Sequence, residues 1–339
     1  MGMVIEGQWS ETDLFMEKGR FTREKSVINR PFKIDAESTM DGRSRYWLIA
    51  SASCPWSHRV TIMRHLRGAG QAISLHIAHG PRQEGYSING GEEWDVPGTG
   101  EAIVHLHQLY TMASPGYTGR ATVPVLWDSQ LCRILSNDSA QIMRTLNAMS
   151  VGCKRPEPDY YPRSLRAQID AVNERIYTRL ANAVYRAGFA IEQAPYEEAV
   201  RDVFNTLDWL EGRLSGARFL MGAVLTEADW RLFPTLVRFD AVYHVLHRCC
   251  RRRLTDYAAL WAYARDLYAW RGICETVDFD EIRHASYTND TAHNPHRIVA
   301  TPPDVDWDAP HDRDSLGTPL AVMRDGSRAA FNPATGEVL

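Results

Sequence analysis

The sequence lacks the features of several large classes of protein. Its 339 residues contain no apolar run near the roughly 20 residues that a membrane-spanning helix needs. They contain no internal repeat, no secretory signal at the N-terminus and no glycine-rich segment with the spacing of a phosphate-binding loop. A net charge of −4 argues against nucleic-acid binding. We therefore expect a cytoplasmic protein with no membrane or nucleic-acid partner.

Cysteine is scarce, and no two cysteines form a C-x-x-C pair. Six scattered thiols exclude a disulfide scaffold and fit a reducing compartment. His244, His247 and Cys250 could share one helix face, but no fourth ligand is in view, so we predict no metal site. What the chain does have is apolar sequence, 44% of its residues, which is enough for two domains that each bury a core.

Residues 43–150 have the pattern of an α/β thioredoxin-like domain, preceded by a polar N-terminal arm at residues 1–42. The pattern predicts, in order, a strand, a loop, a helix and a strand at residues 45–50, 51–56, 57–68 and 73–77. It then predicts an irregular stretch, a β-hairpin and a capped helix at residues 79–121, 122–135 and 137–146. This order, βαβ followed by ββα, is typical of the thioredoxin-like fold.

The sequence becomes helical after a proline-containing linker, and we predict an all-α domain at residues 160–290. Apolar residues at steps of three and four form stripes at residues 165–184 and 200–214. Thr226 and Asp229 have the spacing of a capping box, and a further helix is expected at residues 256–270. Residues 291–339 form a C-terminal extension with a predicted hairpin of residues 320–323 and 328–331.

Cys54 is the candidate nucleophile because a strand gives way to a helix there, with Pro55 in the first helical turn. The amides of that turn and the helix dipole stabilise an anion, which favours the reactive thiolate. Position 57 is serine, so a mixed disulfide at Cys54 has no local partner and waits for an external thiol. The pattern predicts monothiol chemistry that consumes a small thiol such as glutathione.

Three further features fit a binding site for a thiol peptide. Val123 and Pro124 begin a strand where thioredoxin-like domains hold a cis proline, which frees the preceding backbone for an extended peptide. Asp138 and Ser139 start a helix and offer amides, a hydroxyl and an acid for the two charges of a γ-glutamyl group. Arg120 could pair with a carboxylate. The alternatives are an ordinary edge-strand proline, a plain helix cap and a solvated arginine.

With these residues placed, the chain resembles the glutathionyl-hydroquinone reductases, the Xi class of the glutathione transferase superfamily. The resemblance runs from about residue 19 to about residue 299. The segments that carry it are residues 54–59 (CPWSHR), 91–95 (GEEWD), 123–128 (VPVLWD), 137–139 (NDS) and 236–243 (LVRFDAVY). It implies an all-α glutathione transferase C-terminal domain and a homodimer.

The resemblance also implies a reaction. Cys54 would attack the sulfur of a glutathionylated hydroquinone, and a second glutathione would resolve the mixed disulfide, so glutathione would be the cosubstrate. Tyr185 and Tyr287 would line the aromatic pocket and bond the hydroquinone oxygen through their hydroxyls. The residues implied for glutathione are Trp94, which would stack on it, and Arg120, Val123, Asp138 and Ser139.

Two departures from the family pattern bear on this site. Asp138 stands where the family usually has glutamate, and residues 284–287 read HASY where the family has His-Tyr-Tyr, so placing Tyr287 requires a one-residue insertion. The alternatives are an omega-like thioltransferase or dehydroascorbate reductase, an enzyme of this fold that uses another small thiol, and a non-catalytic thiol-binding scaffold.

Overall fold

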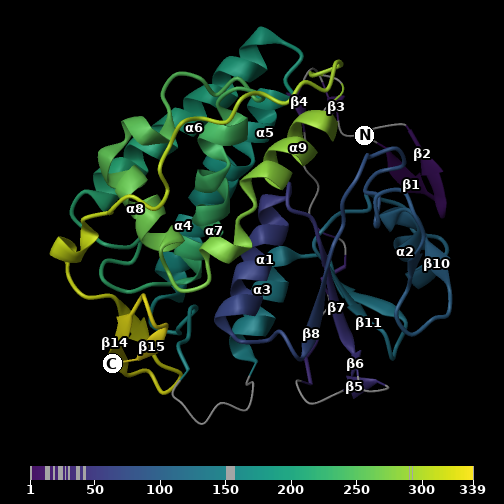
Figure 1. Cartoon of the computed structure of the whole chain (residues 1–339), viewed down its shortest axis with the longest axis horizontal. Coiled ribbons are helices and arrows are strands. Elements are labelled where there is room, and N and C mark those ends of the chain that lie inside the picture. The colour runs from purple at the N-terminus through teal and green to yellow at the C-terminus, as the bar shows by residue number, and fades with distance from the viewer. Residues whose placement is uncertain are drawn as a thin grey trace. The chain divides into compact units, whose positions relative to one another are not determined.

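The structure is a computed structural model that describes residues 2–11, 16–17, 20–21, 26, 28–29, 31–35, 39–40, 43–149, 157–289, 291 and 293–338. Its contacts divide the chain into two compact units (Figure 1). The first comprises Met1–Met16, Glu24–Val151 and Asp280–Ile298, and the second comprises Glu17–Arg23, Gly152–Phe279 and Val299–Leu339. Residues 280–290 thus group with the first unit, whereas the sequence analysis assigned them to the helical domain.

The first unit is built on one mixed sheet with the strand order β12-β11-β7-β8. Its strands are β7 (Tyr46–Ala50), β8 (Ile73–Ile77), β11 (Val125–Asp128) and β12 (Arg133–Ser136). Strands β7 and β8 are parallel and joined through α1 (Pro55–Leu66), whereas β11 is antiparallel to β7 and β12. Helix α3 (Ser139–Ala148) follows β12 and packs against α1. This is the predicted order, and the thioredoxin-like fold is confirmed.

The stretch predicted to be irregular contains a helix that the sequence analysis missed. Helix α2 (Leu106–Ala113) begins after His105, whose backbone N–H donates to Oε1 of Gln108 at 2.8 Å. Histidine is not a usual cap, so the start signal was absent. The unit also contains β1 (Met3–Ile5), β2 (Gln8–Ser10), β5 (Thr39–Met40), β6 (Arg43–Ser44), β9 (Trp94–Asp95), β10 (Ala102–Ile103) and most of α9 (Phe279–Asn289).

The second unit is mainly helical, which confirms the predicted all-α domain. Its α-helices are α4 (Arg166–Ile176), α5 (Ala183–Gly188), α6 (Gln193–Leu214), α7 (Glu227–Val237) and α8 (Ala258–Tyr268). Short π- and 3₁₀-helices are η1 (Tyr177–Ala181), η2 (Phe239–Tyr243), η3 (Leu254–Asp256), η4 (Cys274–Thr276) and η5 (Arg313–Leu316). The two-residue strands β3 (Met16–Glu17) and β4 (Arg20–Phe21) pair with each other.

The C-terminal extension is fastened to the helices of the second unit. The predicted hairpin is present as β13 (Leu320–Val322) and β14 (Arg328–Asn332), with a further strand β15 (Glu337–Val338) that was not predicted. Phe331 stacks on Trp270 with a ring-centroid distance of 5.2 Å. The buried guanidinium of Arg313 donates to backbone carbonyls of Leu214, Ala217, Arg218 and Ala259.

The predicted capping box of Thr226 and Asp229 is present and reaches beyond its own helix. Carboxylate oxygens of Asp229 accept from the backbone N–H of Thr226 at 2.9 Å, from that of Leu220 at 2.8 Å and from the hydroxyl of Tyr263 at 2.9 Å. Burial raises the pKa of Asp229 to about 6 in spite of these donors. The carboxylate therefore joins α7 to α8 and to the turn before α7.

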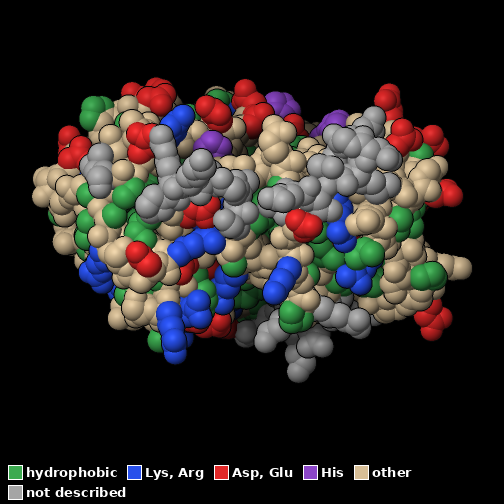
Figure 2. Space-filling view, turned by 90° about the horizontal axis from the view of Figure 1, so that it is seen from below, with side chains coloured by type: hydrophobic (Ala, Val, Ile, Leu, Met, Phe, Trp, Pro, Cys, Tyr) green, Lys and Arg blue, Asp and Glu red, His purple; other side chains and the backbone are tan. Residues whose placement is uncertain are grey.

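Acidic and basic side chains are both present on the face shown in Figure 2, in keeping with the small net charge. Of the helices in the described part of the chain, none has the length and apolar character needed to span a bilayer.

Candidate functional site

Cys54 lies at the N-cap of α1, in the loop that follows β7. The Cys54 sulfur accepts a hydrogen bond from the backbone N–H of Ser57 at 3.4 Å. The backbone N–H of Cys54 donates to the Ser51 carbonyl at 3.0 Å. Pro55 occupies the first helical turn, where a missing N–H costs nothing. Cys54 is 6% exposed, so little of it is open to solvent.

The cis-proline loop faces this cysteine. The Val123–Pro124 peptide bond is cis, as predicted. The thiol of Cys54 donates to the carbonyl oxygen of Val123, which lies 3.5 Å from Sγ. The two loops meet because β11 pairs with β7, so that Val125 lies opposite Ile49 at the same end of the sheet. The backbone of Val123 is therefore beside the thiol, where an extended peptide would present its own cysteine.

Asp138 is the N-cap of α3, and Ser139 is its first residue. Oδ1 of Asp138 accepts from the backbone N–H groups of Ala140 and Gln141 at 2.8 and 3.0 Å. Oγ of Ser139 accepts from Nε of Arg59 at 3.0 Å. Asp138 thus caps the helix, while its Oδ2 atom takes no part in the cap.

Arg59 contacts the candidate site; the sequence analysis quoted it in a motif but gave it no role. It lies on α1, is 7% exposed and holds Ser139 through its guanidinium. This contact fixes the start of α3 relative to the helix that carries Cys54. The signal in the sequence was an arginine next to apolar residues in the predicted helix. A buried arginine needs a partner, so its position indicates a specific contact.

Tyr110 is a second positioning residue, for which the sequence carries no signal. Its buried hydroxyl donates to the Thr122 carbonyl at 2.8 Å and accepts from Nδ2 of Asn137 at 3.1 Å. Thr122 precedes the cis-proline loop and Asn137 precedes the cap of α3, so one phenol joins that loop to the start of the helix. Burial raises the pKa of Tyr110, which keeps the hydroxyl protonated.

Trp94 and Arg120 lie in the long segment between β8 and β11 of the first unit. The Trp94 ring is 4.7 Å from that of His76 on β8 and 6.2 Å from that of Trp47 on β7, centroid to centroid. Arg120 follows Gly119, which pairs with Val4 of the N-terminal hairpin through two backbone hydrogen bonds of 2.9 Å. The N-terminal hairpin therefore braces the segment that leads to the cis proline.

The two candidate tyrosines lie in different units. Tyr287 is on α9 in the first unit and is 3% exposed, and burial raises its pKa. Tyr185 is on α5 in the second unit, and its hydroxyl is 3.2 Å from that of Tyr243. The structure brings Cys54 together with the cis-proline loop directly, and joins that loop to the start of α3 through Tyr110.

The other cysteines offer no rival arrangement. Within the described residues, the cysteines are free thiols, and no group of three or more His, Cys, Asp and Glu side chains could hold a metal ion. Burial raises the pKa of Cys249 to about 12, which makes it a poor nucleophile at neutral pH. Cys153 lies outside the described residues.

Two protein-family models match the chain, one for each part of this architecture. Glutathione S-transferase, N-terminal domain, matches residues 53–149, and Glutathione S-transferase, C-terminal domain, matches residues 193–266. A thiol at the start of the first helix and a helical second domain thus define a glutathione S-transferase.

Individual relatives narrow this assignment. The chain is 40% identical to glutathionyl-hydroquinone reductase YqjG of Escherichia coli, over 93% of this chain and 99% of the relative. A Xi-class glutathione transferase from Natrialba magadii superposes with a TM-score of 0.80 at 38% identity, over 94% of this chain and 98% of the other. The glutathione-bound structure of YqjG superposes with a TM-score of 0.75 at 43% identity, over 80% of this chain and 89% of the YqjG chain. The chain belongs to the Xi class of the glutathione S-transferase family, which confirms the resemblance found in the sequence.

Proposed function

We propose that this enzyme reduces S-glutathionyl-hydroquinones in the cytoplasm, with glutathione as its cosubstrate. The observation that carries the proposal is the placement of Cys54 at the N-cap of α1, with the Val123 carbonyl 3.5 Å from its sulfur. The 40% identity to a glutathionyl-hydroquinone reductase over nearly the whole chain supports the same reaction. Position 57 is serine, which fits a monothiol mechanism.

The reaction has two steps that balance. The Cys54 thiolate attacks the sulfur of the conjugate, the new S–S bond to glutathione forms, and the bond from sulfur to the aromatic carbon breaks. The electron pair of the broken bond stays with that carbon, which takes up a proton, and the hydroquinone leaves. A second glutathione thiolate then attacks the glutathionyl sulfur and releases glutathione disulfide and Cys54. Two glutathionyl groups are oxidised to one disulfide while one carbon–sulfur bond is reduced.

The candidate residues divide between the two halves of the conjugate. The Val123 backbone pairs with the glutathione peptide beside cis-Pro124, and the Asp138 Oδ2 atom takes the γ-glutamyl ammonium group. The hydroxyl and the backbone N–H of Ser139, at the start of α3, take the γ-glutamyl carboxylate. Trp94 stacks on glutathione, Arg120 pairs with a carboxylate, and the hydroxyls of Tyr185 and Tyr287 bond the hydroquinone oxygen.

The proposed function is tested by supplying the conjugate without free glutathione. We expect one hydroquinone released per protein molecule, and one glutathionyl group found by mass spectrometry on Cys54, because no second thiol lies at position 57. Added glutathione should then restart turnover. The exposed thiols of Cys132, Cys250 and Cys274 serve as internal controls and should stay unmodified. Repeated turnover without glutathione would contradict the mechanism, and turnover of mixed disulfides but not of conjugates would show an omega-like thioltransferase.

We also propose that the protein is a homodimer that pairs through β8. This strand is at an edge of the sheet, and Leu75 and Ile77 are 37% and 36% exposed on one face of it. Leu75→Lys is expected to raise the dimer dissociation constant about tenfold or more, because dimerisation would bury the charge. Sedimentation equilibrium measures this, with Ile191→Lys as a matched control on another exposed apolar residue. A wild-type protein that sediments as a monomer would contradict the proposal.

A further inference from the structure

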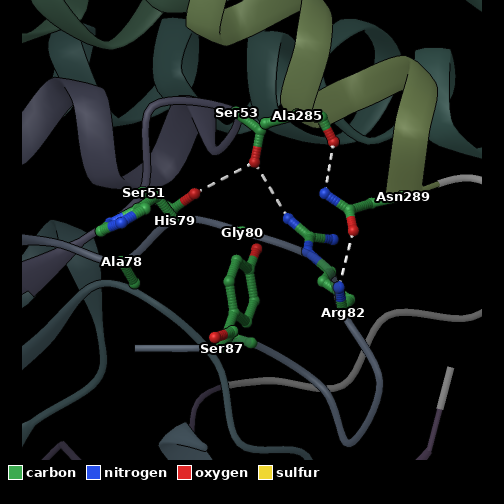
Figure 3. A pocket seen from close by; sticks show the side chains of 10 residues that line it. Ser51, Ser53, Ala78, His79, Gly80, Arg82, Ser87, Ala285 and Asn289 are labelled. Carbon is green, nitrogen blue, oxygen red and sulfur yellow. Dashed lines mark hydrogen bonds between the residues drawn. The ribbon is translucent and has the colours of Figure 1, made fainter. Parts of the chain in front are cut away.

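An open pocket lies beside Cys54 within the first unit, at the carboxyl ends of the parallel strands β7 and β8 (Figure 3). The crevice outside the carboxyl ends of parallel strands is where α/β sheets commonly bind ligands. The residues that line it include Ser51, Ser53, His79, Arg82, Ser87 and Asn289, together with Tyr86. Ser53 immediately precedes Cys54, so a ligand in this pocket lies next to the nucleophile.

Arg82 supplies this pocket with a positive charge. Its Nη2 atom donates to Oγ of Ser53 at 2.9 Å, and its guanidinium carbon is 3.9 Å from the ring centroid of Tyr86. Its backbone N–H donates to Oδ1 of Asn289 at 2.8 Å, which anchors the segment to α9. Among the residues described, no carboxylate pairs with Arg82. A guanidinium has five N–H donors, so most of its capacity is available to an anion.

A second observation is a buried hydroxyl at the same pocket without a partner among the described residues. Ser87 lines the same pocket, is 2% exposed, and its Oγ atom has no hydrogen-bond partner within the described part of the chain. A buried hydroxyl without a partner is uncommon and costs stability, and a ligand oxygen would satisfy it. The hydroxyls of Ser51 and Ser53 are 3.1 Å apart at the other wall and add two more polar groups.

The sheet order separates this pocket from the cis-proline loop and from the start of α3, to which the glutathione backbone and the γ-glutamyl group are assigned. The cis-proline loop and the start of α3 adjoin β11 and β12, on one side of β7. The pocket adjoins β8, on the other side of β7, and Cys54 follows the central strand between them. A conjugate whose γ-glutamyl group lies at the start of α3 therefore leaves the side of Cys54 toward β8 and Arg82 to another part of the conjugate.

We propose that this pocket is a subsite for a carboxylate on the aromatic half of the conjugate, so that the enzyme selects carboxylated hydroquinones. The inference rests on the proposed function and specifies its substrate class. A carboxylate matches the planar fork of Arg82 with two oxygens, and the pocket that holds this fork is also lined by the hydroxyls of Ser87 and Ser51. An uncharged aromatic substituent would leave the guanidinium without an anion.

The test compares two glutathionyl conjugates, one of a dihydroxybenzoate and one of its methyl ester. The measured quantity is the ratio of kcat/KM for the acid to kcat/KM for the ester. We expect Arg82→Leu to lower this ratio about 10- to 100-fold, which is the worth of a paired charge. Arg82→Lys should give an intermediate ratio, because it keeps the charge but loses the fork. Gln83→Leu, at the exposed neighbouring position, should keep the wild-type ratio.

The outcomes separate this inference from the proposed function. A wild-type ratio near one, or a ratio that Arg82→Leu does not change, would overturn the subsite. An equal loss for both conjugates would mean that Arg82 acts on glutathione or on the fold, which also overturns it. If neither conjugate is turned over, the proposed function fails. The subsite is then judged by calorimetric binding of the free dihydroxybenzoate, and equal affinity in wild type and Arg82→Leu would overturn it.

Discussion

Replacing Cys54 by alanine is expected to lower turnover of a glutathionyl-hydroquinone by about 1,000-fold or more, because the variant has no nucleophile to form the mixed disulfide. Ser57 cannot take over, since a neutral hydroxyl is a far weaker nucleophile than a thiolate. Steady-state release of hydroquinone at saturating glutathione measures the loss. Mass spectrometry of the variant incubated with the conjugate should find no glutathionyl group.

The matched control for this experiment is Cys132→Ala. Cys132 lies in the same unit, is an exposed free thiol and is not near Cys54 in the sheet order. This variant should keep wild-type turnover. Circular dichroism and thermal unfolding should show both variants folded, because the Cys54 sulfur makes only two long hydrogen bonds. A Cys54→Ala variant that kept more than about a tenth of the activity would exclude covalent catalysis through this thiol.

The largest effect on stability is expected at Asp229. Removing its carboxylate with Asp229→Ala leaves two backbone N–H groups and the Tyr263 hydroxyl buried without an acceptor. Each unsatisfied buried group costs about 1 to 3 kcal/mol, so we expect a loss of roughly 3 to 5 kcal/mol in the free energy of unfolding. Urea unfolding followed by tryptophan fluorescence measures it. A loss below about 1 kcal/mol would contradict the role of this carboxylate.

The matched control is Asp256→Ala. Asp256 accepts from the backbone N–H of Arg253 at 2.8 Å in a comparable cap, but it is exposed, so water replaces the lost acceptor. Its removal should cost about 1 kcal/mol or less. The difference between the two variants isolates the cost of burial from that of capping.

Asp229 also gives stability a defined pH dependence. Its pKa in the folded protein is about 6, above the ordinary value of 3.8, so the folded state binds the proton more tightly than the unfolded chain does. The corresponding stability is fully present below about pH 4 and is lost as pH rises through 6. Relative to Asp229→Asn, the wild type should lose about 1 kcal/mol between pH 5 and pH 7. An increase over that range would contradict the sign.

The sequence predicted the fold where local signals are strong. Strand β8 (Ile73–Ile77) was predicted with its observed bounds because apolar residues alternate with polar ones there. The capping box at Thr226 marked the start of α7. The stripe at residues 165–184 suggested one helix, whereas the structure has α4, the π-helix η1 and α5. Apolar periodicity cannot distinguish one continuous helix from two helices joined by a π-helix, because a single π-helical turn shifts the apolar stripe only slightly.

The candidate site was predictable only in part, for a physical reason. Cys54 and Asp138 begin helices, and a residue at a helix start can be recognised from its neighbours in the chain. Tyr110 and the pair of Arg82 with Ser53 act through contacts between residues that lie on different elements. No pattern of spacing encodes such contacts, so they required the three-dimensional structure.

The late position of Arg313 has a consequence for synthesis of the chain. Its guanidinium binds carbonyls near residues 214–218, almost one hundred positions earlier in the sequence. Those carbonyls cannot receive the Arg313 hydrogen bonds until residue 313 has been synthesised. The final packing of this part of the helical unit therefore depends on a residue of the C-terminal extension, which is synthesised after the helices that it holds.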